Sequence, residues 1–95
     1  MMPKLMIPTP LRQYADEHDA VELDAATVGE ALEKLINSHN ALRQHLFNDE
    51  GKLRSFVNVY MNDEDIRYLD GDKTVVGAGD VISIVPSIAG GLNVI

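Results

Sequence analysis

Residues Thr27-Val28-Gly29-Glu30 have the spacing of a capping box at the start of a helix. In a capping box the threonine and glutamate side chains each accept a hydrogen bond from the other residue's otherwise unpaired backbone N–H. Apolar residues then recur at intervals of three and four, which is the pattern of a helix with one buried face: they are Val28, Ala31, Leu32, Leu35 and Ile36. The sequence therefore predicts one amphipathic helix from Val28 to near His39 that packs against a sheet.

Strand patterns lie on both sides of this helix. Residues 4–8 and 20–24 alternate apolar and polar side chains and predict an N-terminal hairpin. Residues 56–62 are rich in β-branched and aromatic side chains, a turn and a short strand at 66–68 are expected next, and 81–85 form the last strand. This order predicts an α+β domain of the β-grasp type, with one helix across a mixed sheet.

Composition restricts the classes of function. A chain of 95 residues supports one domain and one core, and we expect no deep, walled substrate cavity. The formal charge of −7, with lysines and arginines that do not cluster in the sequence, argues against nucleic acid and anionic membranes and favours basic partners. No apolar stretch approaches membrane-spanning length, and the N-terminal segment lacks signal-peptide features, so we expect a cytoplasmic protein. Without cysteine there is no thiolate nucleophile.

The pair Gly90-Gly91 follows the last predicted strand. Glycines without Cβ atoms adopt backbone angles closed to other residues and can pass through a narrow slot in another protein. This suits a carboxyl group that must reach the active site of a different enzyme. A Gly-Gly pair alone is also common in ordinary chain ends, so only its context gives it meaning.

That context is residues 79–91, which read Gly-Asp-Val-Ile-Ser-Ile-Val-Pro-Ser-Ile-Ala-Gly-Gly. The segment resembles the C-terminal signature of the ubiquitin-like sulfur carriers (the ThiS and MoaD type) of molybdopterin, thiamine and cysteine biosynthesis. In that family a Gly-Asp turn opens the last strand, a proline follows, and Gly-Gly ends it. Residues 56–67 resemble the cysteine-forming branch most, and the likeness covers nearly the whole chain.

The resemblance implies a carrier that is not itself an enzyme and binds no cofactor. Its Gly91 carboxylate would be adenylated by an E1-like enzyme that uses ATP, and then converted to a thiocarboxylate that donates sulfur. Residues 1–91 would form the carrier domain, and the extension 92–95 would be removed by a zinc metalloprotease of the JAMM type. The implied acceptor is a pyridoxal-phosphate sulfhydrylase that makes cysteine, ahead of molybdopterin or thiamine pathways.

Two other functions are compatible with the sequence. A ubiquitin-like modifier would form isopeptide bonds to lysines through Gly91 by the same chemistry up to the acyl-adenylate. A β-grasp interaction domain would use the fold without any chemistry at Gly-Gly. A stand-alone enzyme is the least expected, because the motifs assemble no nucleophile, base and oxyanion donor.

Strand alternation also predicts which residues could dock partners. One side of the last two long strands should face the helix: Val57, Val59, Met61, Ile82 and Ile84. The opposite side should then present an apolar patch built from Val85, Tyr60 and Phe56, although isolated surface hydrophobes are common.

No metal site is expected from the sequence. His18, His39 and His45 match no zinc-ligand spacing and are predicted to be surface residues. Asp63-Glu64-Asp65 lacks the alternating ligands and central glycine of a calcium loop and is predicted to be a solvated turn.

Overall fold

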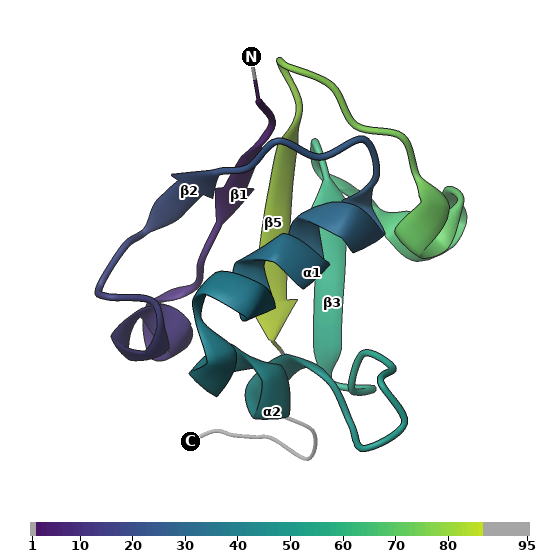
Figure 1. Ribbon diagram of the computed structural model, residues 1–95. Coiled ribbons are helices and arrows are strands. Elements are labelled where there is room, and N and C mark those ends of the chain that lie inside the picture. The colour runs from purple at the N-terminus through teal and green to yellow at the C-terminus, as the bar shows by residue number, and fades with distance from the viewer. Residues whose placement is uncertain (1, 87–95) are drawn as a thin grey trace.

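The computed structural model describes residues 2–86, and in it one helix lies across one face of a five-stranded sheet (Figure 1). The α+β prediction is confirmed. In chain order the elements are β1 (Lys4–Met6), η1 (Thr9–Tyr14), β2 (Ala20–Glu22), α1 (Val28–Ser38), η2 (Asn40–Leu42), α2 (Arg43–Leu46), β3 (Val57–Met61), β4 (Glu64–Asp65), η3 (Ile66–Tyr68), η4 (Gly71–Lys73) and β5 (Val81–Pro86).

The sheet has the strand order β2-β1-β5-β3-β4. Strands β1 and β2 form the predicted antiparallel hairpin, and β5 runs parallel to β1 with Leu5 opposite Ile82. On its other side β5 pairs antiparallel with β3. The last strand is therefore central in the sheet and hydrogen-bonded on both edges, which is the arrangement of a β-grasp.

The start of α1 carries the predicted cap, with one change of partner. The Thr27 side chain accepts a hydrogen bond from the Glu30 backbone N–H at 3.2 Å. The Glu30 carboxylate accepts at 2.7 Å from the N–H of Ala26, one residue earlier than the predicted partner. Thr27 forms an isolated antiparallel bridge with Val75. Cap and bridge together fix the chain as it enters the helix.

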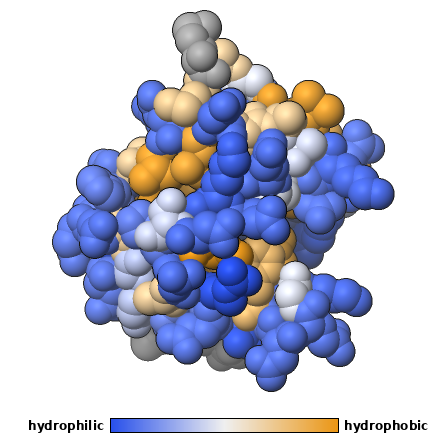
Figure 2. Space-filling model, viewed as in Figure 1, coloured by the Kyte–Doolittle hydropathy of each residue, from blue (hydrophilic) through white to orange (hydrophobic). Residues whose placement is uncertain are grey.

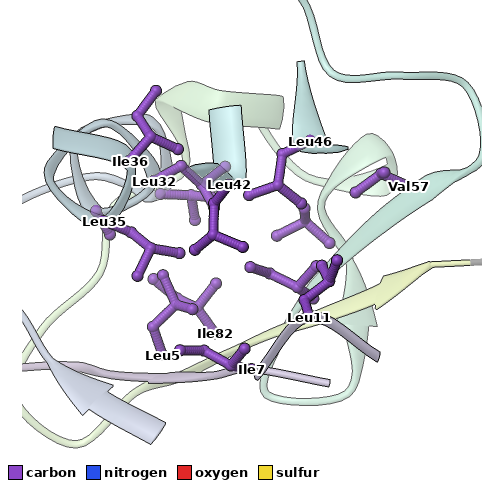
Figure 3. Packing of buried hydrophobic residues seen from close by; sticks show 14 of the residues in the cluster. Leu5, Ile7, Leu11, Leu32, Leu35, Ile36, Leu42, Leu46, Val57 and Ile82 are labelled. Atoms are coloured by element: carbon purple, nitrogen blue, oxygen red, sulfur yellow. The ribbon is translucent and has the colours of Figure 1, made fainter. Parts of the chain in front are cut away.

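The core lies between α1 and the sheet and is a cluster of buried apolar side chains. In Figure 3 Leu32 and Leu35 of α1 point toward Leu5 and Ile82 of the sheet, and Leu42 lies between the two layers. All of these side chains are essentially inaccessible to solvent. The predicted inward faces are confirmed, since Val57, Val59, Ile82 and Ile84 are buried and Met61 packs half-buried against the core.

The predicted strand at 66–68 is wrong. Asn62 and Asp63 adopt positive φ angles of 53° and 77°, and the turn they make leads into a strand of only two residues, β4. The Asp65 side chain then accepts a hydrogen bond from the backbone N–H of Arg67 at 2.8 Å, and the chain continues as the 3-10 turn η3. An aspartate side chain that captures a backbone N–H in this way competes with sheet pairing.

Candidate functional site

In the sequence the Gly90-Gly91 pair begins four residues after the end of strand β5, and the pair lies outside the described residues. Its final residue, Pro86, is opposite Val57 at the start of β3. Ladders on both edges hold the strand, and the buried side chains Ile82 and Ile84 anchor it to the core. The end of β5 at Pro86 is therefore held in a fixed position on the sheet.

The Gly-Asp turn before β5 is a hydrogen-bonded unit. One carboxylate oxygen of Asp80, Oδ2, accepts from the Gly77 N–H at 2.8 Å, and the Asp80 N–H donates to the Gly77 carbonyl at 3.0 Å. The other oxygen, Oδ1, accepts from the side-chain amide of Asn62 at 2.9 Å. The hydrogen bonds from Asn62 and then from Gly77 lower the pKa of Asp80, because both stabilise its ionised form. This aspartate fixes where β5 begins.

The three docking candidates lie where the alternation predicted exposed or half-exposed side chains. Val85 is 44% exposed and Phe56 is 37% exposed, while Tyr60 is half-buried. In the register of β3 and β5, Tyr60 is opposite Ser83, two residues before Val85. Tyr60 and Val85 are therefore diagonal neighbours on the sheet face that points away from α1. Phe56 precedes β3 and lies beside this face.

Met6 extends the same sheet face and was missed by the sequence interpretation. It is half-buried and lies opposite Ser83 on the other edge of β5, so Met6, Ser83 and Tyr60 form one row across three strands. The alternation of β1, in which Leu5 is buried, carries enough information to place it. We call Met6, Tyr60, Val85 and Phe56 the outer patch.

An ion pair at β4 was also missed. Asp65 is 6% exposed, and its carboxylate accepts three hydrogen bonds from the Arg67 guanidinium, the shortest at 2.6 Å. The side-chain hydrogen bond from Arg67 is the main reason that the pKa of Asp65 lies below its ordinary value. The solvated-turn prediction thus holds for Asp63 and Glu64, which are exposed, but is wrong for Asp65.

Two of the three histidines are not surface residues, contrary to the sequence prediction. The His45 ring stacks on Tyr14 with 4.1 Å between ring centroids, and its Nε2 atom is buried. The His39 side chain is 15% exposed, with Nδ1 3.8 Å from a carboxylate oxygen of Asp16. His18 is exposed as predicted. The sequence could not show this, because η1 becomes a partner of the 39–45 segment only in the folded chain.

Residues 2–86 also bear on other classes of function. No group of three or more histidine, aspartate or glutamate side chains is placed to hold a metal ion. None of the helices found there has the length and apolar character needed to span a membrane.

A five-stranded β-grasp sheet whose central last strand leads into Gly-Gly defines the ubiquitin-like class of protein. The model of the ThiS family matches residues 5–91, and the chain belongs to this family. The sulfur carrier protein CysO of Mycobacterium tuberculosis is 36% identical over 87 residues, which is 90% of this chain and 94% of the relative.

Two further relatives extend the comparison. CysO in the crystal structure of the BexX/CysO complex of Amycolatopsis orientalis superposes with a TM-score of 0.82 at 39% identity, covering 93% of this chain and 98% of that one. Small archaeal modifier protein 1 of Haloferax volcanii is 39% identical over 72 residues, 75% of this chain and 78% of the relative. The resemblance to ubiquitin-like sulfur carriers is thereby confirmed.

Proposed function

We propose that this sulfur carrier holds its sulfur as a thiocarboxylate on Gly91. The observation that carries the proposal is that the family match extends through Gly91, beyond a β5 strand that is fixed on both edges. Such a strand gives a partner enzyme a rigid handle, while the glycines pass through a narrow slot. The carrier supplies the atom and the handle, and its partners supply the catalysis.

The activation chemistry belongs to an E1-like partner. A carboxylate oxygen of Gly91 attacks the α-phosphorus of ATP, pyrophosphate leaves, and an acyl-adenylate forms. A sulfur donor then attacks the acyl carbon and AMP leaves, so that one carboxylate oxygen is replaced by sulfur. In this scheme the carrier needs neither a cysteine nor a bound cofactor, and the chain contains no cysteine.

Activation requires a free carboxylate on Gly91, but residues 92–95 follow it in this chain. We propose that a JAMM-type zinc metalloprotease hydrolyses the peptide bond after Gly91. Until that cut is made, the carbonyl of Gly91 is an amide, which is a far poorer group for adenylation than a carboxylate.

The proposed acceptor is a pyridoxal-phosphate sulfhydrylase that holds an aminoacrylate. The thiocarboxylate sulfur attacks the β-carbon and gives a thioester, and the new amine then displaces sulfur at the acyl carbon to leave an amide. Hydrolysis after Gly91 releases cysteine, and the same metalloprotease can catalyse it. The 36% identity to a protein named CysO supports cysteine as the product ahead of molybdopterin or thiamine.

A second candidate function is protein modification. The 39% identity to small archaeal modifier protein 1 favours it specifically. The acyl-adenylate is common to both functions, and the nucleophile decides the outcome: sulfur gives a carrier, and a lysine amine gives an isopeptide bond.

The mass of the intact protein isolated from its native cells separates these functions. A carrier ends at Gly91 and is heavier than the free acid by the difference between sulfur and oxygen. A modifier is found joined to lysines of other proteins. An unchanged chain still carrying residues 92–95, with neither product in sulfur-limited cells, would contradict both proposals.

A further inference from the structure

An open groove of about 670 Å³ lies beside α1, on the opposite face of the sheet from the outer patch. Its walls come from α1, the 47–55 segment, β3 and the residues after β4, to the right of α1 in Figure 1. The half-buried side chains of Phe47 and Leu53 give the groove its accessible apolar surface. Buried core residues also line it and expose little area: Leu32, Ile36, Val57 and Val59. Figure 2, in the same view, shows hydrophobic atoms between hydrophilic lobes in this region.

Basic side chains are concentrated around this groove, although the protein as a whole is acidic. Four of the eight basic residues line it: Arg43, Lys52, Arg54 and Arg67. Only three of the fifteen acidic residues do so, namely Glu33, Asp65 and Asp72. These basic residues do not cluster in the sequence, but folding brings together positions up to 24 residues apart.

The basic charge is concentrated at one end. Arg67 is matched by Asp65, whereas in the described part of the chain the side chains of Arg43 and Lys52 have no hydrogen-bond or ion-pair partner. Arg54 is held in place because its Nε atom donates to the Gln44 carbonyl at 2.8 Å. A second, adjoining hollow shares Arg43, Arg54 and Phe47 with the groove, so this basic end is continuous with it.

Of the acidic lining residues, Asp72 lies beside Gly29 near the start of α1, and Glu33 lies midway along that helix. Gly29 allows close packing: a Cβ atom at this position would be 3.0 Å from the Asp72 backbone oxygen. The groove thus presents the apolar side chains of Phe47 and Leu53 beside three basic residues at the α2 end, Arg43, Lys52 and Arg54, for which the described part of the chain shows no ion pair. That combination fits a ligand that is apolar in one part and acidic in the next.

We propose that this groove docks a segment of a partner protein that carries both apolar and acidic side chains. A small anion alone would leave the half-buried Phe47 and Leu53 exposed to water, and two copies of a chain with net charge −7 repel each other. Val57 both lines the groove and pairs with Pro86, so a bound segment lies at the end of the sheet where β5 ends. A partner can therefore hold the carrier there and leave the outer patch free for a second protein.

The test is a titration of the ¹⁵N-labelled protein with an acetylated peptide of alternating glutamate and leucine. The expected result is amide shifts at Arg43, Leu53, Arg54 and their groove neighbours, with affinity that falls about tenfold on raising salt from about 0.05 to 0.5 M. A lysine–leucine peptide of the same length should cause no such shifts. Equal shifts with both peptides, or none with the glutamate–leucine peptide, overturn the proposal.

Charge-reversal variants locate the binding. Arg43→Glu and Lys52→Glu should each weaken the glutamate–leucine peptide about tenfold. Lys73→Glu is the matched control, because Lys73 is equally exposed, lies outside the groove and changes the net charge by the same amount. An equal loss in the control shows a general charge effect and overturns the proposal. Two other results would also overturn the proposal. One is that ATP shifts the same amides more strongly than the peptide does, and the other is that the protein self-associates at the concentrations used.

Discussion

The side-chain amide of Asn62 donates a hydrogen bond to Oδ1 of Asp80 at 2.9 Å, joining two turns that are 18 residues apart in the sequence. The side-chain oxygen of Asn62 also accepts from the backbone N–H of Val81 at 2.9 Å, and the backbone N–H of Asn62 donates to the Val81 carbonyl at 2.8 Å. One residue at the end of β3 thus fixes the first residue of β5. The register between the two strands is set at this point.

Replacing Asn62 separates its two contributions. Asn62→Gly removes the side-chain hydrogen bonds but keeps the left-handed backbone (φ 53°) accessible, and should lower the free energy of unfolding by about 1–2 kcal/mol. Asn62→Ala should cost about 1 kcal/mol more, because alanine resists positive φ. Urea unfolding measures both. An alanine variant as stable as the glycine variant would contradict the importance of the turn geometry.

Acid should weaken the protein through Asp80 and Asp65. The folded pKa of each lies below its ordinary value of 3.8, so the contribution to stability is complete above that value and is lost as pH falls through the folded pKa. Unfolding free energy should therefore decline steeply below about pH 4. Asp80→Asn should flatten this decline. Asp63→Asn, at an exposed neighbour, is the control and should leave the slope unchanged.

Val85→Asp should weaken binding to the activating enzyme by about 2 kcal/mol without unfolding the protein. The reason is that Val85 is 44% exposed on the outer patch, so a charge there is harmless until a partner excludes water. Val75→Asp is the matched control, since Val75 is 73% exposed and lies in the loop before β5. Thermal melting and partner titration decide the matter. Comparable binding by the two variants would mean that the outer patch does not dock this enzyme.

The form of the protein that ends at Gly91 should support ATP–pyrophosphate exchange with its E1-like enzyme, whereas the 95-residue form should not. Only the shortened form has a carboxylate at Gly91. A form that ends at Gly90 serves as the control for a free carboxylate at the wrong position, and exchange should be strongly reduced. Equal exchange by the 95-residue form would rule out the precursor proposal.

Features set by short-range pattern could be predicted from the sequence. The capped helix and the alternation of β3 and β5 each depend on residues within one turn or one strand, and both are present as expected. The β-grasp type of fold, with one helix on a mixed sheet, followed from the order of these elements along the chain. The Gly-Asp turn was also visible, but its partner Asn62 was not, because nothing local links the two positions.

The features that could not be predicted depend on contacts between segments that are distant in the sequence. His45 is covered because η1 brings Tyr14 onto its ring, and the groove is basic because Arg43, Lys52, Arg54 and Arg67 converge on it. The prediction of a strand at 66–68 was wrong for a different reason. The side chain of Asp65 accepts a hydrogen bond from the backbone N–H of Arg67, which would otherwise be available for sheet pairing. The alternation of apolar and polar residues carries no information about such a bond.

The parallel pairing of β1 with β5 has a mechanical consequence. The amino end of β1 and the carboxyl end of β5 lie at opposite ends of the same ladder, with Lys4 opposite Val81 and Met6 opposite Ser83. A force that draws these two ends apart acts along the strands and loads all the hydrogen bonds between them at once. They cannot open one after another, as they would in a hairpin pulled from its free ends. A pull on the carboxyl end of β5, with the domain held at the amino end of β1, is therefore resisted by all of these hydrogen bonds together.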